Sequence, residues 1–383
     1  MSLVSARMLS GDALHWCRMF FRNLILMSIA LSTGAQTMMN GRPSVVLGGK
    51  AAEVVVDLGG GSIVEFQFKD HRLNPLTWNS GEPGPARPMG HFVCLDRWGA
   101  PSEAESKNGM PFHGEASHVA WKMTREPQRA GGAIRAEMAA SLPLAGLGIT
   151  RRMELSEDAA LLRVSESVTN TNKLGRVYNM VQHASIAPPF LDETTVVDAN
   201  ARKGFMQSSP LPNPEEPAVW WPQALKDGQP VNLRRLTNDD EPEVVSFAID
   251  DEYGWVTASN AAKGLLIGYI WKASDYPWLD IWRFTQDGKP AARGLEFGTT
   301  GLHQPEGVLV AKGKIFGRPI YAHIDTGETV SRSYAAFLFK IPPDYHGVGA
   351  ITHGSSRLVL HERGAGPDRD LAMAVGRLFS GRE

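Results

Sequence analysis

The chain has 383 residues, 43% of them hydrophobic and 21% charged, so it can form one large domain or two ordinary ones and is not disordered throughout. Its 39 lysines and arginines against 41 aspartates and glutamates give a net charge of −2, which excludes the basic footprint of a dedicated nucleic-acid-binding protein. Two cysteines, Cys17 and Cys94, are too few for a disulfide framework or a four-cysteine zinc site.

The first 35 residues have the order of a secretory signal. Arg18 and Arg22 precede the apolar run 24–31, and small residues then precede a possible cleavage point after Ala35. The apolar run is far shorter than the ~20 residues that span a bilayer, although an uncleaved anchor is the alternative. We expect residues 1–35 to be a signal peptide or leader. The mature protein is then periplasmic or secreted, without a stable membrane span, and Cys94 is its only thiol and a small buried residue.

The body of the chain has the pattern of many short strands. Glycine and proline make up about a sixth of the residues, against a usual ~12%, which favours frequent turns. The segments 62–68 and 161–168 alternate in polarity, as strands with one solvent-facing side do. Long amphipathic helices do not alternate with the strands, so a parallel β/α sheet is disfavoured. We expect an all-β fold, one large antiparallel β-sandwich over residues 36–362, followed by a helical tail (363–383) with a short C-terminal helix over 368–379.

Two motifs have a functional and a structural interpretation. The segment Asp57-Leu-Gly-Gly-Gly-Ser62 resembles a phosphate loop, but it lacks the lysine and a strand follows it, so we expect a glycine turn between strands. His113, Glu115 and His118 have metal-ligand chemistry, but a strand would place the two histidines on opposite faces. For His113 the remaining alternatives are a polar pocket lining and a structural role, and we expect no metal site and no cofactor.

Two polar residues lie in apolar strand-like segments. His183 interrupts the run Asn179–Pro189, where a lone histidine is more often a satisfied core residue than a functional one. Glu296 lies between Leu and Phe, and a carboxylate placed there is either hydrogen-bonded in a pocket or costly. Trp278 and Trp282 have flat apolar faces with a polar edge, suited to stacking on sugars, although tryptophans are also ordinary core residues.

Taken in order, these motifs resemble the aldose 1-epimerase, or galactose mutarotase-like, superfamily. The similarity covers roughly residues 45–361 and rests on Gly90–Arg97, Phe112–Gly114, His183 and Gly294–Glu296. The resemblance implies a large β-sandwich (a galactose mutarotase-like supersandwich), which agrees with the strand pattern. It also implies chemistry that opens a hemiacetal ring with one acid and one base.

The resemblance assigns roles to four residues. Arg97 and His113 would hold sugar hydroxyls, His183 would be the general acid at the ring oxygen, and Glu296 would be the base at the anomeric hydroxyl. Asp280 is a candidate for the substrate-binding aspartate by neighbourhood only. By analogy with other sugar-cleaving pairs, we expect His183 and Glu296 to face each other across roughly 5–7 Å, without direct contact.

The sequence therefore predicts a carbohydrate-active protein that resembles an aldose 1-epimerase isomerase. Its partner would be a carbohydrate substrate, bound with the help of Trp278 and Trp282. This chain has Glu115 where true mutarotases have the second glycine of a Gly-Gly pair, and a non-catalytic carbohydrate-binding β-sandwich remains the alternative. A hydrolase or lyase is a third option, but Glu296 lacks a convincing carboxylate partner in the sequence.

Overall fold

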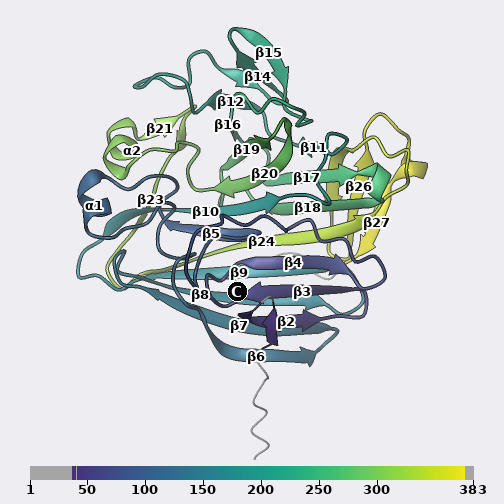
Figure 1. Cartoon of the computed structure of the whole chain (residues 1–383), viewed down its shortest axis with the longest axis horizontal. Helices are drawn as coiled ribbons and strands as arrows, with labels where there is room; N and C mark the ends of the chain where they lie inside the picture. Colours follow the sequence, from purple (N-terminus) through teal and green to yellow (C-terminus); the bar gives the residue numbers. More distant parts are fainter. Residues whose placement is uncertain (1–36, 40, 376–383) are drawn as a thin grey trace, which may run out of the picture. The chain divides into compact units, whose positions relative to one another are not determined.

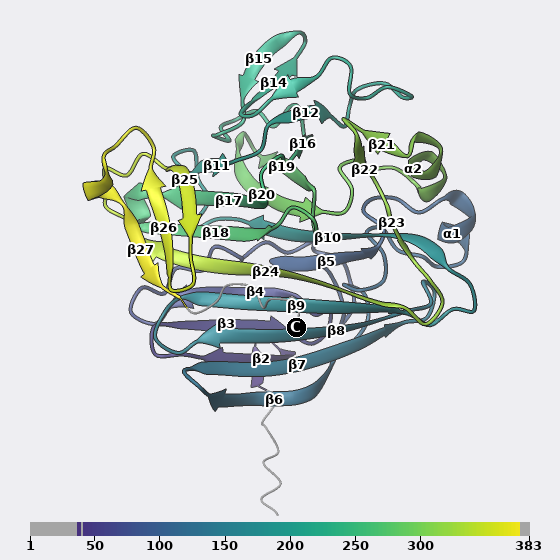
Figure 2. The ribbon, with the colours of Figure 1, turned by 180° about the vertical axis from the view of Figure 1, so that it is seen from behind.

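The computed structural model describes residues 37–39 and 41–375. The expected leader and the last eight residues of the expected tail lie outside the described residues. Within the described part of the chain, the strands form antiparallel sheets of 12 and 8 strands, which lie one over the other (Figures 1 and 2). The prediction of a large antiparallel β-sandwich is confirmed.

The larger sheet contributes the strands that matter for the site. In spatial order, its strands are β1 (Thr37–Met39), β2 (Arg42–Gly48), β3 (Ala52–Asp57), β4 (Ile63–Phe68), β5 (His91–Asp96), β10 (Arg176–Ile186), β20 (Lys289–Gly298), β19 (Trp278–Gln286), β16 (Val244–Ala248), β12 (Lys203–Met206) and β13 (Val219–Trp220), with β23 (Ala322–Ile324) paired to β10.

The smaller sheet covers one face of the larger one. Its strands, in spatial order, are β11 (Val196–Ala199), β17 (Tyr253–Asn260), β18 (Leu265–Lys272), β24 (Thr329–Lys340), β9 (Leu161–Asn170), β8 (Leu147–Ser156), β7 (Ala133–Leu142) and β6 (Lys122–Ala130).

Small elements decorate the sandwich. They are the hairpin β14 (Gln223–Lys226) and β15 (Gln229–Asn232), the pair β21 (Lys314–Ile315) and β22 (Arg318–Pro319), the sheet β25 (Val348–His353), β26 (Arg357–Glu362) and β27 (Leu371–Ala374), the helices α1 (Glu103–Lys107) and α2 (Glu306–Lys312), and the 3₁₀ turns η1 (Ala261–Lys263) and η2 (Pro367–Arg369). No helix in residues 37–39 and 41–375 is long and apolar enough to cross a membrane.

Alternating side chains along the strands separate a core face from an outer face. The segment predicted to alternate over 161–168 is β9, whose residues switch regularly between buried and half-buried. The segment 62–68 forms β4, but a register shift in its pairing with β3, between Val55 and Val56, disturbs its alternation. Asp57–Ser62 is the turn between β3 and β4, as expected.

The main core lies between the two sheets. The larger sheet contributes residues such as Val93 and Phe297, and the smaller sheet contributes residues such as Leu162 and Leu338. A buried polar network crosses this core, in which Gln182 contacts His91 at 3.1 Å. The side chains next to these in the strands, including Phe92 and His183, belong to the opposite, outer face of the larger sheet.

The expected C-terminal helix over 368–379 is wrong where the structure describes it. Pro367–Arg369 forms a single 3₁₀ turn, and Leu371–Ala374 forms β27, which pairs with β26. Leu371 and Met373 pack on a second apolar cluster, so burial of alternate side chains in a sheet overrides the helical pattern.

Candidate functional site

A row of side chains crosses four neighbouring strands on the outer face of the larger sheet. The register pairs Phe92 of β5 with His183 of β10, and Asp280 of β19 with Glu296 of β20. The pairing of Gln182 with Phe297 places His183 opposite Glu296. Because neighbours across a sheet lie side by side, residues that are far apart in the sequence meet in one row.

His183 and Glu296 are in direct contact. Nε2 of His183 lies 3.1 Å from Oε1 of Glu296, and the two side chains are 7% and 1% exposed. The expected gap of roughly 5–7 Å is therefore wrong. That expectation came from enzymes that hold a water or a sugar ring between two carboxylates, whereas direct cross-strand pairing brings these two groups together.

Each member of the pair has a second partner that orients it. The indole Nε1–H of Trp98 donates to Oε2 of Glu296 at 2.9 Å. Nδ1 of His183 lies 2.9 Å from the Ser185 hydroxyl. Gly294 lies on the same face two residues before Glu296, and a Cβ there would come within 2.3 Å of the Glu296 carboxyl. Residue 294 must therefore be a glycine for the Glu296 carboxyl to lie where it does.

Burial favours the uncharged forms of both groups. It lowers the pKa of His183 to about 3, and nearby His303 and His91 add to this. Burial raises the pKa of Glu296 well above its usual value, Asp280 raises it further, and the Trp98 hydrogen bond opposes the shift. The 3.1 Å approach of Oε1 of Glu296 to Nε2 of His183 is then a contact between two uncharged groups.

Asp280 continues the row beyond Glu296. It is fully buried, and neither carboxyl oxygen has a hydrogen-bond partner among the described residues. Burial raises its pKa well above the usual value, and neighbouring Ser246 opposes the shift only in part. Asp280 therefore sits beside Glu296 as an uncharged acid, and its charge would raise the cost of ionising Glu296.

Replacing Asp280 by Asn should stabilise the protein at alkaline pH. A carboxyl whose pKa is raised in the folded state makes its full contribution to stability below its unfolded-state pKa. This contribution is lost as the pH rises toward the folded-state pKa. Asn keeps the shape of the side chain without its charge. The melting temperature should therefore rise at pH 8, by about 2–4 °C for each kcal/mol of stability gained, and change little at pH 4. Thermal melts of Asp280→Asn and of the exposed control Asp250→Asn at both pH values test this. A loss of stability at pH 8 would contradict it.

Aromatic rings surround the His183 imidazole. Phe92 stacks on it with the ring centroids 4.3 Å apart, and Trp282 meets it edge-on at 5.8 Å. Trp78 lies 6.1 Å away in a parallel orientation and contacts Trp282 at 5.6 Å. Trp78 and Trp282 are only half-buried, so the row opens onto apolar ring faces of the kind that stack on sugars.

Two further histidines border the pair. The His113 ring lies 5.3 Å from His183, and the backbone N–H of Gly99 donates to its Nδ1 at 3.0 Å. The His303 ring lies 5.6 Å from His113 and 4.7 Å from Trp98. Gly99 has a φ of +102°, and a Cβ there would meet the His303 ring at 2.8 Å. Nε2 of His113 and both ring nitrogens of His303 form no hydrogen bond with described residues, so they can meet the hydroxyls of a ligand.

Several solved structures with this architecture are described as galactose mutarotase-like proteins or candidate aldose 1-epimerases. A galactose mutarotase-like protein of Clostridium acetobutylicum is 14% identical over 78% of this chain and 96% of its own, with a TM-score of 0.57. One from Lactobacillus casei ATCC 334 is 12% identical over 77% of this chain and 100% of its own, with a TM-score of 0.55. A candidate aldose 1-epimerase of Escherichia coli K12 is 15% identical over 78% and 99%, with a TM-score of 0.53. This chain has the galactose mutarotase-like fold.

No protein-family model and no curated protein matches the sequence. At identities this low, the structural matches establish the fold and not the activity. The sequence-based resemblance to the galactose mutarotase-like superfamily is confirmed at that level. Within this fold, the structure brings four of the predicted site residues together, namely His183, Glu296, His113 and Trp282.

Arg97 does not join the row of site residues through any contact of the described residues. Its guanidinium is 3% exposed and forms two hydrogen bonds with Asp96, at 3.0 and 2.9 Å. It also contacts Glu105 at 2.7 Å and lowers the pKa of that carboxyl to about 2. These partners occupy the group, so its predicted role in holding sugar hydroxyls has no support in its geometry.

Arg97→Ala should therefore destabilise the fold. Removing the cation leaves the fully buried carboxylate of Asp96 with Arg176 as its remaining basic partner, and breaking such a pair costs about 3–5 kcal/mol. Arg152, whose side chain is 72% exposed in its pair with Glu137, provides the control, since Arg152→Ala should cost about 0–1 kcal/mol. Urea unfolding of both variants makes the comparison. If Arg97→Ala were as stable as the wild type but no longer bound sugar, Arg97 would be a sugar-binding residue after all.

Trp278 is a core residue rather than a binding residue. It is fully buried, its Nε1–H donates to the carbonyl of Pro319 at 2.8 Å, and its ring packs against Phe205 at 5.9 Å. It shares the outer face with Trp282, but the segment that carries α2, β21 and β22 covers it, as the shared cluster with Leu309 and Ile320 shows. The expected stacking of a sugar on Trp278 is therefore wrong.

The fold does not bring the side chains of His113, Glu115 and His118 together at one point. The Glu115 carboxylate accepts the backbone N–H of Ala145 at 2.6 Å, and His118 pairs with Glu82 at 3.0 Å. His113 points to the other histidines instead. No group of three or more potential metal ligands is arranged around one point in the described residues.

The sequence analysis missed several residues of the site. Phe92 and Trp98 lie in or next to the Gly90–Arg97 motif, and Ser185 lies two residues after His183 on the same strand face, so spacing could have suggested these three. Trp78 and His303 come from loops, and only the tertiary structure brings them to the row. Cys94 is fully buried in the small cluster below it, as expected.

Proposed function

We propose that this protein is a carbohydrate-active protein that opens and closes the hemiacetal ring of an aldose and so interconverts its anomers. The His183–Glu296 contact on an aromatic-walled outer face carries the proposal. The similarity to galactose mutarotase-like structures supports a carbohydrate-related role for the fold. The reaction needs a base at the anomeric hydroxyl and an acid at the ring oxygen, and the pair offers one group of each kind.

The two groups can serve both oxygens although they touch. The anomeric hydroxyl and the ring oxygen of an aldose are bonded to the same carbon, so the two proton-transfer positions are neighbours. A carboxyl and an imidazole 3.1 Å apart match two neighbouring oxygens better than groups on opposite sides of a sugar ring. Direct contact is thus compatible with ring opening.

A single proton shift prepares the pair. In the neutral pair the exchangeable proton lies on Glu296, whose Oε1 is 3.1 Å from Nε2 of His183. Moving that proton to Nε2 produces a carboxylate and an imidazolium, which are the base and the acid that the reaction requires. Glu296 then takes the proton of the anomeric hydroxyl while His183 protonates the ring oxygen, the bond between that oxygen and the anomeric carbon breaks, and the open-chain aldehyde forms. Ring closure on the other face of the aldehyde reverses these transfers.

The surrounding residues would hold the sugar. The half-buried faces of Trp78 and Trp282 offer stacking surfaces, and the imidazoles of His113 and His303 offer hydrogen-bonding nitrogens. Burial lowers the pKa of His303 to about 4, so it is neutral at pH 7 and can donate and accept hydrogen bonds. A neutral, hydrogen-bonding pocket suits polyhydroxylated ligands.

The test is catalysis of anomeric exchange. Freshly dissolved α-glucose and α-galactose should relax to the anomeric equilibrium faster with the protein than without it, measured by polarimetry and by NMR exchange between anomeric protons. A set of aldoses that bind without any acceleration would overturn the proposal. That outcome would favour the second candidate, a non-catalytic carbohydrate-binding module, to which the deep burial of both polar groups also lends weight.

We also propose that the protein is exported after cleavage near Gln36, on the order of charged, apolar and small residues in the leader. Mass spectrometry of the protein recovered from its native host should show an amino terminus close to Gln36 in a periplasmic or secreted fraction. An intact amino terminus in a cytosolic fraction would contradict this prediction. Cys17 would leave with the leader.

A further inference from the structure

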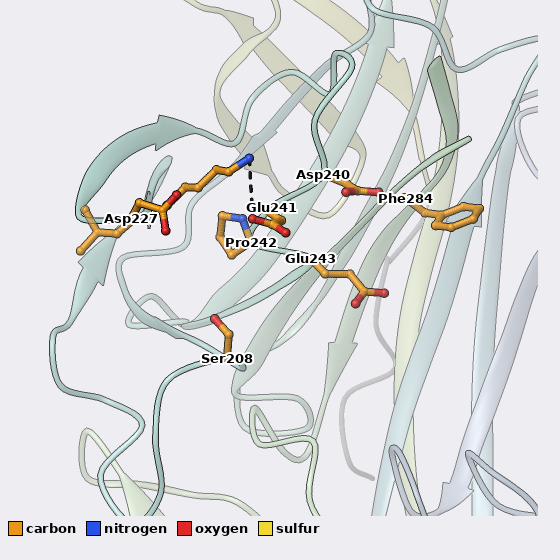
Figure 3. A pocket seen from close by; sticks show the side chains of 9 residues that line it. Ser208, Asp227, Asp240, Glu241, Pro242, Glu243 and Phe284 are labelled. Carbon is orange, nitrogen blue, oxygen red and sulfur yellow. Dashed lines mark ion pairs between the residues drawn. The ribbon is translucent and has the colours of Figure 1, made fainter. Parts of the chain in front are cut away.

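A hollow of about 590 Å³ lies beside the candidate site. It is bounded by the β14–β15 hairpin, by the segment before β16, and by the outer end of β19. Its lining includes Ser208, Lys226, Asp227, Asp240, Glu243 and Phe284 (Figure 3). Its volume is within the range of pockets that hold small organic ligands.

Aromatic contacts connect the hollow to His183. Phe284, which lines the hollow and is 39% exposed, stacks on Trp282 with 5.9 Å between the ring centroids and 16° between the ring planes. Trp282 in turn contacts His183. Its Nε1–H donates to Glu243 of the hollow at 3.2 Å. A continuous aromatic surface thus leads from the acid–base pair to the hollow.

Carboxylates dominate the polar lining of the hollow. In Figure 3, Asp240 and Glu243 lie between Phe284 and Asp227. Lys226 is the only basic residue of this lining, and it is paired with Asp239 at 2.5 Å and with Glu241 at 3.6 Å. Carboxylates beside an exposed ring can accept hydrogen bonds from sugar hydroxyls or ammonium groups, and they repel acidic sugars.

We propose that the hollow is a second sugar subsite and that the ligand is a neutral or amino-sugar chain rather than a single monosaccharide. The reducing-end sugar, which has the free anomeric hydroxyl, lies at the His183–Glu296 pair. The next sugar stacks on Trp282 and Phe284, with its polar groups toward Asp240 and Glu243. The placement of the reducing end rests on the proposed function, whereas the stacking of the second sugar does not.

Calorimetric titration of the protein with matched sugars tests the subsite. The probes are glucose, maltose, cellobiose, the β-1,4-linked glucosamine dimer and digalacturonate. At least one neutral or amino dimer should bind about 10-fold more tightly than glucose, the usual worth of one aromatic stacking contact, and digalacturonate should show no such gain. Phe284→Ala should remove most of the gain, and Glu243→Gln should reduce it and lessen the discrimination against digalacturonate.

Trp220→Ala is the matched control. Trp220 is 59% exposed but does not line the hollow, so the variant should keep the full gain of the dimers. Equal affinity for glucose and every dimer, a gain that survives Phe284→Ala, or failure of all the probes to bind would overturn the subsite. If the wild-type protein binds dimers through Phe284 but accelerates no anomeric exchange, the proposed function fails and the subsite stands. If the protein accelerates the anomeric exchange of glucose but binds no dimer more tightly than glucose, the proposed function stands and the subsite fails.

Discussion

Replacing Glu296 by Gln is expected to lower the rate of catalysed anomeric exchange by about 10²–10⁴-fold, the usual worth of a positioned acid or base. Gln keeps the shape of the side chain, and its carbonyl can still accept the Trp98 N–H, so the row on the sheet stays intact. It cannot take the proton of the anomeric hydroxyl. NMR exchange spectroscopy at saturating sugar measures the turnover, and titration measures binding, which should change little.

Stability separates this outcome from a structural role. Because burial raises the pKa of Glu296 above its ordinary value of 4.5, the carboxyl stabilises the fold fully below that value and less as the pH rises toward the folded one. Glu296→Gln should therefore melt no lower than the wild type at pH 8.

The matched control is Glu166→Gln. Glu166 is also a buried carboxylate, but it is paired with Arg151 at 2.6 Å in the core network on the inner face. This change should cost stability and leave the turnover of the folded fraction near that of the wild type. A Glu296→Gln protein that unfolds readily yet keeps full activity would end the catalytic assignment of Glu296.

The second large effect is expected for His183→Asn, with a loss of turnover of about 10²–10⁴-fold. Asn can hydrogen-bond to Ser185 or Glu296, but it cannot carry a proton to the ring oxygen. Because His183 and Glu296 act through one shared proton, their effects should not add, and the double variant should be about as slow as the slower single variant. The same exchange assay on all three variants completes the cycle.

His91 offers a matched histidine for comparison. It is 1% exposed, lies on the inner face of the same sheet, and contacts Gln182 rather than the outer row. His91→Asn should lower the melting temperature and leave the turnover of the folded protein unchanged. His183→Asn should lower the turnover and leave the melting temperature nearly unchanged. If the two variants lost stability equally and His183→Asn kept its turnover, His183 would be a core histidine.

The sequence by itself determined the fold class of this protein. Apolar alternation with period two and frequent glycine and proline turns are local properties, so a strand such as β9 could be predicted from the residues alone. The order of the motifs around Arg97, His113, His183 and Glu296 pointed to the right fold for the same reason, because each motif is a short local pattern.

Only the tertiary structure decided which of the candidate residues meet. His183 and Glu296 touch because β10 and β20 are neighbours in the sheet, and no local pattern encodes that register over 113 positions. Trp278 and Trp282 have similar sequence contexts and the same strand face, yet the segment carrying α2 buries one and leaves the other half-open.

Charge partners and long-range pairing explain the remaining errors. Arg97 was predicted to face a ligand, but Asp96 and Glu105 surround its guanidinium, because a buried cation is stable only with anionic partners. The predicted C-terminal helix became β27 because β26 offers an unpaired edge and an apolar cluster to cover. Strand pairing and burial depend on residues far away in the chain, so these features follow from the assembled sandwich and not from the local sequence.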